Sequence, residues 1–304
     1  MTKLFKRIVF SIFMMIVIIN HLSACDICGC SSSNYFLGPS PQFGREFIGV
    51  RYSLRSFNTV LANDNTQFSK DFFQTTEIWG GLKIKKKFEL LAFIPFNINH
   101  SISDDGTNSN SGLGDVMVIG NYNFINNESL TKDTTTMRQR FALGFGVKLP
   151  TGHFAVVPTD IVSSANNQTG TGSVDFIVDG SYSLIIERWG MTGNIGYKIN
   201  QPALNFRFGN RFDATLFCFH SYHQKENTFS PNIGLLFYNL NPNQYENADV
   251  PSTGGYSLLG AAGMEMRFNK ITTGFNLQYP LAENISDGQT KINLRGMIHL
   301  TFAF

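Results

Sequence analysis

The chain has 304 residues, of which only 15% are charged, and its formal net charge is +2. So small a charge argues against a nucleic-acid partner, and the lack of any run of 18 apolar residues argues against a helical membrane protein. Phenylalanine and glycine are abundant, with 29 and 28 residues. This composition suits strands that have one apolar and one polar face.

Residues 1–24 have the pattern of a secretory signal peptide. Three basic residues lie among the first seven positions, a largely apolar run covers residues 8–19, and the small residues Ser23 and Ala24 follow. The apolar run is too short for a membrane-spanning helix, which needs about 20 residues. We therefore expect the chain to be exported and the mature protein to begin after Ala24.

Three of the four cysteines, Cys25, Cys28 and Cys30, come next in a C-x2-C-x-C spacing. The preceding residues complete a bacterial lipobox, so we expect Cys25 to carry a lipid anchor. Two alternatives remain open: the three thiolates bind a soft metal ion such as Cu(I), or they form a disulfide or stay free in an oxidising compartment. Residues 25–45 are then either a tether or a plug for the domain that follows.

From residue 46 onward, apolar and polar residues alternate with period two, which is typical of strands. In the first such segment Ile48 and Val50 share one face, whereas Arg51 and Arg55 share the other. The pattern predicts about twelve strands, over roughly residues 46–57, 72–84, 87–96, 114–125, 138–149, 173–186, 188–199, 205–220, 228–239, 255–268, 270–281 and 290–304.

These predicted strands favour a membrane barrel over a soluble sandwich. Most have about 10 to 15 residues, which suits tilted membrane strands, and long polar loops mostly alternate with short turns along the chain. In a soluble two-sheet sandwich the apolar faces would point inward. Here glycines recur on the polar faces, and the charged residues fall on the face that would line the lumen of a barrel. We therefore predict an all-β, transmembrane, antiparallel up-and-down barrel over residues 46–304, in the outer membrane of a Gram-negative bacterium.

The C-terminal segment supports this prediction. The chain ends on Phe304, and the same lipid-facing row is expected to continue through Phe302, Leu300, Ile298, Leu294 and Ile292. This ending is similar to the terminal strand that bacterial outer-membrane barrels present to the barrel assembly machinery. We therefore expect Phe304 and Phe302 to form an assembly signal.

An internal repeat relates two segments that each follow a proline-ended strand. Gly112, Asp115 and Tyr122 match Gly172, Asp175 and Tyr182 at a constant offset. Pro95 and Pro150 are expected to end the two preceding strands, because proline cannot donate a hydrogen bond to the ladder. By parity, both aspartates should point into the lumen near its outer mouth and influence which ions pass.

Charged residues of both signs are predicted to line the lumen. They lie on the polar faces of their strands, opposite the rows expected to face lipid, and Glu77, Glu265 and Arg295 belong to the same set. Such charges either hold the wall together through salt bridges or select solutes in an open pore. The predicted pore-lining residues are Arg51, Arg55, Asp115, Arg140, Lys148, Asp175, Asp179, Arg207 and Arg211.

The segments KLPTG at residues 148–152 and GLGD at residues 112–115, with the glycine-rich return strands, resemble the outer-membrane barrel family of meta-pathway phenol-degradation proteins, often described as transporters. The similarity covers roughly residues 45–304 and leaves out the cysteine cluster. It implies an outer-membrane transport protein of the broad hydrophobic-compound type.

The sequence thus predicts a barrel for passive passage of small, in part hydrophobic, molecules. The alternatives are a metal-handling barrel that uses the cysteine cluster and a closed structural barrel. Catalytic residues and cofactors are not expected, because no serine–histidine–acid set can be placed on neighbouring positions. The expected partners are outer-membrane lipid, the barrel assembly machinery and a small-molecule solute.

Overall fold

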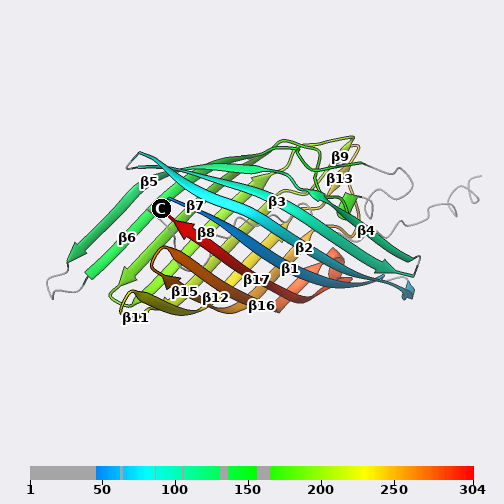
Figure 1. Cartoon of the computed structure of the whole chain (residues 1–304). Coiled ribbons are helices and arrows are strands. Elements are labelled where there is room, and N and C mark those ends of the chain that lie inside the picture. The colour runs from blue at the N-terminus through cyan, green and yellow to red at the C-terminus, as the bar shows by residue number, and fades with distance from the viewer. Residues whose placement is uncertain (1–45, 62–63, 86, 105, 131–135, 156–164) are drawn as a thin grey trace, which may run out of the picture.

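The computed structural model describes residues 46–304, apart from residues 62–63, 86, 105, 131–135 and 156–164. Twelve antiparallel strands form a closed barrel with a strong tilt (Figure 1). The barrel strands are β1 (Phe47–Leu61), β2 (Asp64–Lys85), β3 (Phe88–Ser103), β5 (Met117–Leu130), β6 (Thr136–Lys148), β7 (Asp175–Ile186), β8 (Trp189–Ile199), β10 (Arg211–His220), β12 (Asn227–Leu240), β15 (Gly255–Phe268), β16 (Ile271–Ile285) and β17 (Thr290–Ala303).

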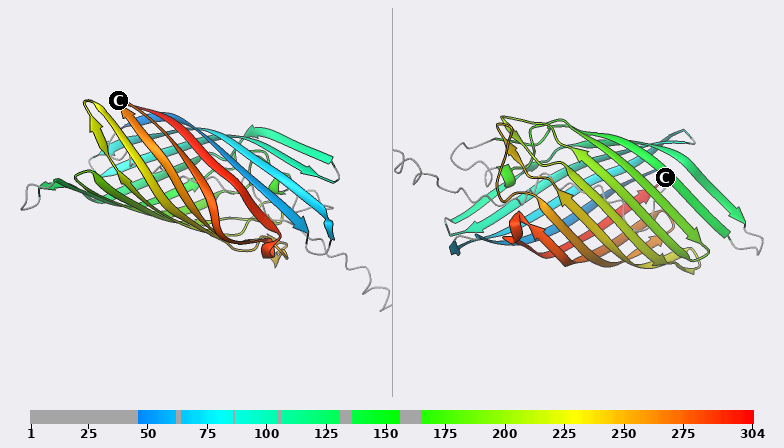
Figure 2. Two further views of the ribbon diagram at one scale, coloured as in Figure 1. Left: turned by 90° about the horizontal axis from the view of Figure 1, so that it is seen from below. Right: turned by 180° about the vertical axis from the view of Figure 1, so that it is seen from behind.

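Neighbours in the chain are neighbours in the wall, and β1 pairs with β17 to close the ring. This closure leaves no unpaired sheet edge, which a wall surrounded by lipid requires. The predicted all-β, up-and-down barrel of about twelve strands is therefore confirmed. Views from below and behind show how the strands wrap around into a tilted barrel (Figure 2). Within the described residues, no helix is both long and apolar enough to cross a membrane.

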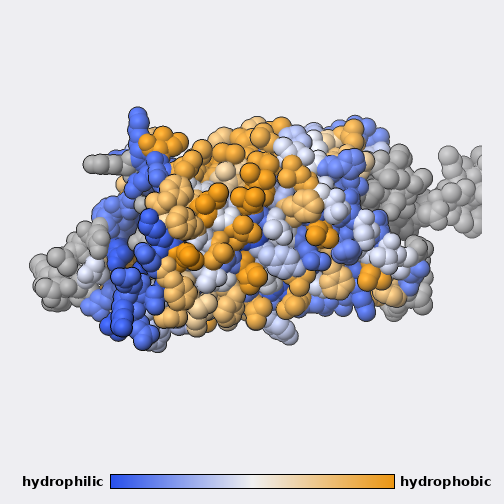
Figure 3. Space-filling view, in the orientation of Figure 1, coloured by the Kyte–Doolittle hydropathy of each residue, from blue (hydrophilic) through white to orange (hydrophobic). Residues whose placement is uncertain are grey.

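The outer surface carries the apolar half of each alternating strand. Ile48, Ile195 and Ile298 are more than half exposed there, as are many other apolar side chains along the wall. Figure 3 shows an apolar band over the middle of the face in view, with hydrophilic residues toward both ends. A band of this kind matches the hydrocarbon layer of a membrane.

Two segments that the sequence analysis took for long loops continue as strands. β1 extends to Leu61, and β2 already begins at Asp64. β3 extends to Ser103 and pairs with a further strand, β4 (Gly106–Leu113). Backbone pairing in a hairpin does not depend on side-chain polarity, so strands that pass beyond the membrane keep their ladder while their outer face becomes polar. Hydropathy alternation therefore ends before the strands do.

Pro95 does not end its strand, in contrast to the prediction, whereas Pro150 follows the end of β6. Pro95 faces residues 114–116, a break between β4 and β5, and its carbonyl accepts a 2.8 Å hydrogen bond from the Gly114 N–H. The ladder has no need of a donor from residue 95 at this break, so proline is tolerated in the middle of β3. The break also turns Asp115 into the lumen.

One residue of the C-terminal row faces the opposite way from the prediction. Leu294, Ile298 and Phe302 point outward, but Ile292 is buried inside the barrel. The register between β1 and β17 shifts at Ser56 and Phe57, and such a bulge moves the following side chains to the other face.

Short elements gather at the end of the barrel where β8 and β12 finish (Figure 1). Three short strands pair there as a small separate sheet, and Phe206, Phe208 and Ala165 form a buried apolar cluster with it. This cluster joins three connections that are far apart in the sequence. The strands of this small sheet are β9 (Phe206–Arg207), β13 (Gln244–Tyr245) and β14 (Ala248–Asp249), and the 3-10 turn η1 (Ser286–Gly288) lies at the same end. The remaining short strand, β11 (Tyr222–Gln224), lies at the opposite end, between β10 and β12.

Candidate functional site

The candidate site is the lumen, which is lined by the inward half of each strand. Arg51 and Arg55 on β1 are about 5% and 6% exposed, whereas Val50, next to Arg51 in the chain, is 48% exposed on the outside. Strand pleating alone produces this division, because successive side chains point to opposite faces. Buried apolar residues, among them Trp79 and Phe93, also point inward, so the lining is partly apolar.

Arg51 forms an ion pair with Glu77, its direct cross-strand partner on β2. The guanidinium also lies 5.2 Å from the Trp79 ring centroid and 5.8 Å from that of Phe93. An arginine held by a carboxylate and two aromatic rings is well compensated for its burial. This contact therefore stabilises the wall.

Arg140 on β6 makes the second ion pair, with Glu89 on β3, and also donates to the Asn123 side chain on β5 between them. Beside it, Gly144 leaves space for a third acidic group. A Cβ at position 144 would come within 2.0 Å of the Asp179 carboxylate and 2.2 Å of the Asn121 side chain. Glycine is therefore required at position 144, because the side chains of Asp179 and Asn121 from the two neighbouring strands occupy the space that a Cβ would need.

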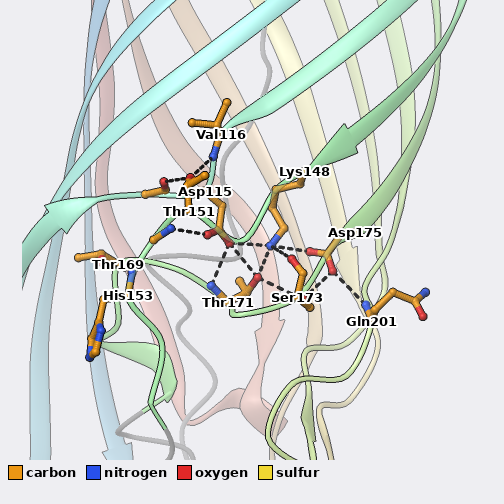
Figure 4. A network of polar contacts seen from close by, with 12 residues as sticks. Asp115, Val116, Lys148, Thr151, His153, Thr169, Thr171, Ser173, Asp175 and Gln201 are labelled. Carbon is orange, nitrogen blue, oxygen red and sulfur yellow. Dashed lines mark hydrogen bonds and ion pairs between the residues drawn. The ribbon is translucent and has the colours of Figure 1, made fainter.

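Lys148 lies at the centre of the largest polar network (Figure 4). Its Nζ is 2.6 Å from an Asp115 oxygen and 2.8 Å from an Asp175 oxygen, and it also donates to Thr171 Oγ1 and the Ser173 carbonyl. Lys148 and Asp175 are fully buried, and Asp115 is 4% exposed. One cation thus connects the end of β6, the start of β7 and the break before β5.

The same network fixes the connection between β6 and β7. Asp115 accepts hydrogen bonds from the backbone N–H groups of Gly152 at 3.0 Å and Thr171 at 2.9 Å. From β3, the side-chain amides of Asn97 and Asn99 each donate at 2.9 Å to the carbonyls of Thr169 and Gln168. Residues 165–173 are therefore attached to the inner wall at the mouth of the barrel.

The positions of Asp115 and Asp175 change their interpretation. The sequence analysis expected both carboxylates to act on ions at the outer mouth. In the structure they bind Lys148 and backbone groups and are almost excluded from solvent. The repeat that relates them brings both to one lysine, and their geometry favours a structural role.

Arg207 is placed differently from the prediction, which put it on a lumen-lining strand over residues 205–220. The barrel strand β10 begins only at Arg211, and Arg207 belongs to β9, opposite Gln244 of the small sheet. Leu204 and Asn205 both adopt positive φ angles, 49° and 64°, so a tight turn interrupts the chain before β10. Alternation of side chains cannot reveal such a turn.

A third group of inward residues surrounds Tyr238 on β12. The Arg211 Cζ is 4.7 Å and the Arg295 Cζ 4.9 Å from the Tyr238 ring centroid, and the Arg55 Cζ is 5.9 Å from that of Phe73. We call Arg55, Phe73, Arg211, Tyr238 and Arg295 the arginine–tyrosine cluster. The sequence analysis missed Tyr238 although it shares the inward parity of Ser230 and Asn232, because only charged residues were taken as lining the lumen.

The predicted assembly residues lie on the lipid-facing side at the end of the chain. Phe302 is 45% and Phe304 60% exposed, and the Phe304 N–H donates to the Glu46 carbonyl at 3.1 Å. The last residue thus pairs with the start of β1 at the seam where the barrel closes.

Cys25, Cys28 and Cys30 lie outside the described residues, and so do the predicted signal peptide and the segment 25–45. Within the part of the chain that the structure describes, no group of three or more His, Cys, Asp or Glu side chains could hold a metal ion. Cys218, the one cysteine there, is exposed on β10.

Comparison with a solved outer membrane channel supports the fold. The COG4313 outer membrane channel from Pseudomonas putida F1 aligns over 88% of this chain and 100% of its own, with a TM-score of 0.61 and 14% identity. The beta domain of the Bordetella autotransporter BrkA covers 86% and 100%, with a TM-score of 0.48 and 9% identity. No curated protein matches the chain.

The fold and the apolar band are those of a barrel in the outer membrane, which agrees with the predicted localisation. A comparison with protein families then identifies the group to which the sequence belongs. The matching family model extends over residues 55–224, which is more than half of the chain. This range includes most of the first eight wall strands and the Lys148 network. The chain belongs to the family described as "Putative MetA-pathway of phenol degradation".

Proposed function

We propose that the protein is a passive outer-membrane channel for small molecules, without enzymatic activity. The observation that carries this proposal is a closed barrel whose outer face is apolar while charged residues of both signs point inward. Lipid surrounds the first surface, and only the second suits a hydrated path.

The proposed path is narrow. Twelve strands lie between the roughly eight that side chains fill and the 16–18 that leave a wide water channel. The inward side chains are nearly excluded from solvent, and residues 165–173 are attached to the wall at the mouth. We therefore expect small conductance steps and passage of small solutes only.

Planar bilayer recordings and liposome swelling with the purified protein test the proposal. We expect discrete low-conductance steps in KCl, and swelling rates that fall steeply as neutral solutes increase in size. Heat-denatured protein, added at the same concentration, is the control. A folded barrel that yields neither steps nor swelling would favour the closed structural barrel instead.

The family description names phenol degradation, and the inward apolar residues near Trp79 would tolerate an apolar solute. We therefore propose small molecules with an apolar body as cargo. Phenol and glucose, compared in the swelling assay, test this preference: phenol should enter faster relative to its size. Equal permeability after correction for size would contradict it.

Assembly is proposed to depend on Phe304, because its ring extends the lipid-facing row and its N–H pairs with Glu46 at the seam. Deletion of Phe304 should lower the amount of heat-modifiable barrel in the outer membrane. Lys291→Gln on the outer face of the same strand is a control that should assemble normally.

The lipid anchor on Cys25 remains a proposal from the lipobox. Cys25→Ser should leave the signal peptide attached and abolish labelling by a fatty-acid analogue. Cys28→Ser and Cys30→Ser should leave labelling intact, because only the residue after Ala24 can become the amino terminus. If Cys25→Ser matures normally and each of the three variants loses bound copper, the cluster is a metal site instead.

A further inference from the structure

The arginine–tyrosine cluster brings three cations together inside the barrel from strands that are far apart in the wall. Arg55 on β1 and Arg295 on β17 are direct cross-strand partners. Arg211 comes from β10, and both it and Arg295 lie against the Tyr238 ring, at 4.7 and 4.9 Å. Because β15 and β16 separate β12 from β17, Arg295 reaches Tyr238 across the lumen.

Positive charge gathers beside Arg295. Arg55 is its cross-strand partner, and Arg211 lies against the same Tyr238 ring. Arg295 makes no ion pair with a described carboxylate, whereas Arg211 Nε lies 3.9 Å from Asp213. Lys198 is also near enough to act on Asp213 and adds a further positive charge. Arg295 thus has two arginines beside it and, within the described residues, no carboxylate of its own.

Arg295 also has an unused donor. Its Nε is buried without a hydrogen-bond partner, and the residue is only 7% exposed. Tyr238 attracts the guanidinium through its ring and accepts a side-chain hydrogen bond from it, but Nε is still left without an acceptor. A buried cation with an unused donor and like-charged neighbours is costly unless an anion compensates it.

Apolar residues adjoin these cations. Tyr238 belongs to a buried cluster of inward side chains with Phe217, Leu236, Leu259, Ile292 and Met297. An inorganic anion would gain nothing from this surface, whereas an organic anion could place its apolar part there. The two neighbouring surfaces thus match a molecule with one charged end and one apolar end.

We infer that the arginine–tyrosine cluster is a binding site for a small organic carboxylate. The carboxylate accepts hydrogen bonds from the Arg295 guanidinium, and the apolar body packs on the Tyr238 side of the lumen. As a statement about cargo, the inference rests on the proposed channel; as a statement about binding, it stands on the cluster alone. No bond is formed or broken.

Binding can be measured on the folded, full-length protein in zwitterionic detergent, with benzoate as the probe. Benzoate should raise the thermal unfolding midpoint in a saturable way, whereas benzyl alcohol, a neutral molecule of similar shape, should not. Acetate, which lacks the apolar body, should bind more weakly than benzoate. Equal effects of benzoate and benzyl alcohol would overturn the inference without any variant.

Variants then assign the binding to Arg295. Arg295→Gln should weaken benzoate binding about ten-fold or more, because hydrogen bonds to a charged group contribute about 1.5–3 kcal/mol. Arg295→Lys, which keeps the charge but not the planar fork, should recover part of the affinity. Lys291→Gln removes the same charge from the outer face of β17 and should bind benzoate normally. Unchanged binding by Arg295→Gln would overturn the assignment.

Bilayer recordings separate this inference from the proposed function. Benzoate binding without any conductance would keep the site and contradict the channel. Conductance without benzoate binding would keep the channel and contradict the site. If both hold, benzoate should also reduce or interrupt chloride current in the wild type and less so in Arg295→Gln.

Discussion

Lys148 and Arg295 are two cations buried in the same lumen, and their surroundings are opposite in sign. Lys148 lies between two carboxylates at 2.6 and 2.8 Å and also donates to Thr171 and Ser173. Arg295 faces Arg55 and Arg211, rests against an aromatic ring and keeps a buried donor unused. The first cation is more than compensated by acidic groups, and the second is not.

This difference separates two uses of buried charge. A buried ion pair with all its hydrogen bonds made becomes part of the fold, because removing one partner leaves the other uncompensated. A buried cation among like charges lowers stability, and proteins keep such arrangements mainly where function requires them. Lys148 therefore stabilises the structure at the mouth of the barrel, whereas Arg295 belongs to the proposed carboxylate-binding site.

The largest effect is expected from Lys148→Met, which leaves Asp115 and Asp175 buried without their cation. We expect a loss of about 3–5 kcal/mol in unfolding free energy, and weaker attachment of residues 165–173 to the wall. Urea unfolding of the barrel in lipid vesicles, followed by the heat-modifiable band on gels, measures this loss.

A matched rescue makes the Lys148 prediction specific. Adding Asp115→Asn and Asp175→Asn to Lys148→Met removes the buried charges while conserving shape, and should recover much of the lost stability. Lys291→Met, which removes an exposed lysine, should have little effect. A Lys148→Met barrel as stable as the wild type would remove the structural half of the comparison.

Gly170→Ala should disturb the same network through space rather than charge. A Cβ at position 170 would lie 2.6 Å from the Gly152 backbone and 2.7 Å from an Asp115 oxygen. Overpacking of this kind typically costs about 1–3 kcal/mol. The urea midpoint should fall accordingly, whereas Gly120→Ala, whose nearest contact would be 3.9 Å away, should remain near the wild type.

The parts of the molecule that sequence predicts well are those in which lipid imposes a pattern. The twelve wall strands, their antiparallel order and the outward row that includes Phe302 follow from period-two alternation, because each wall residue faces either lipid or the lumen. Ile292 was misplaced because a bulge changes parity without changing composition. The extensions of β1 to β4 were missed because alternation in hydropathy stops where both faces meet water.

The candidate site is less visible in the sequence than the fold. Parity correctly gives the inward direction of Arg51, Arg55 and Arg140, but it contains no information on which charges meet across the lumen. Lys148 lies 33 residues from Asp115, and the pairing of β6 with β5, together with the break before β5, brings them within 2.6 Å. Arg295 and Tyr238 come from strands separated by two others, so neither alternation nor a repeat could bring them together.

Arg295→Gln tests the other half of the comparison. Its effect on the unfolding free energy should be smaller than that of Lys148→Met and either absent or opposite in sign. Loss of a cation among like charges should leave the unfolding free energy unchanged or raise it by roughly 1 kcal/mol in the absence of a carboxylate. The urea midpoint measured without and with benzoate checks this: benzoate should stabilise the wild type and not the variant. A loss as large as that of Lys148→Met would show that Arg295 is structural.

The smallest effect is expected on ion preference when the Lys148 network is neutralised as a whole. In the triple variant Lys148→Met, Asp115→Asn, Asp175→Asn, the lumen loses one net negative charge, but that charge is excluded from solvent and so is remote from moving ions. The reversal potential in a KCl gradient should therefore stay close to the wild-type value, with any shift toward anions. Arg295→Gln should move it further, toward cations, because its charge lies on the proposed path. If the triple variant instead shifts selectivity more than Arg295→Gln does, the two carboxylates face the ions after all, and the contrast between the two buried cations is reversed.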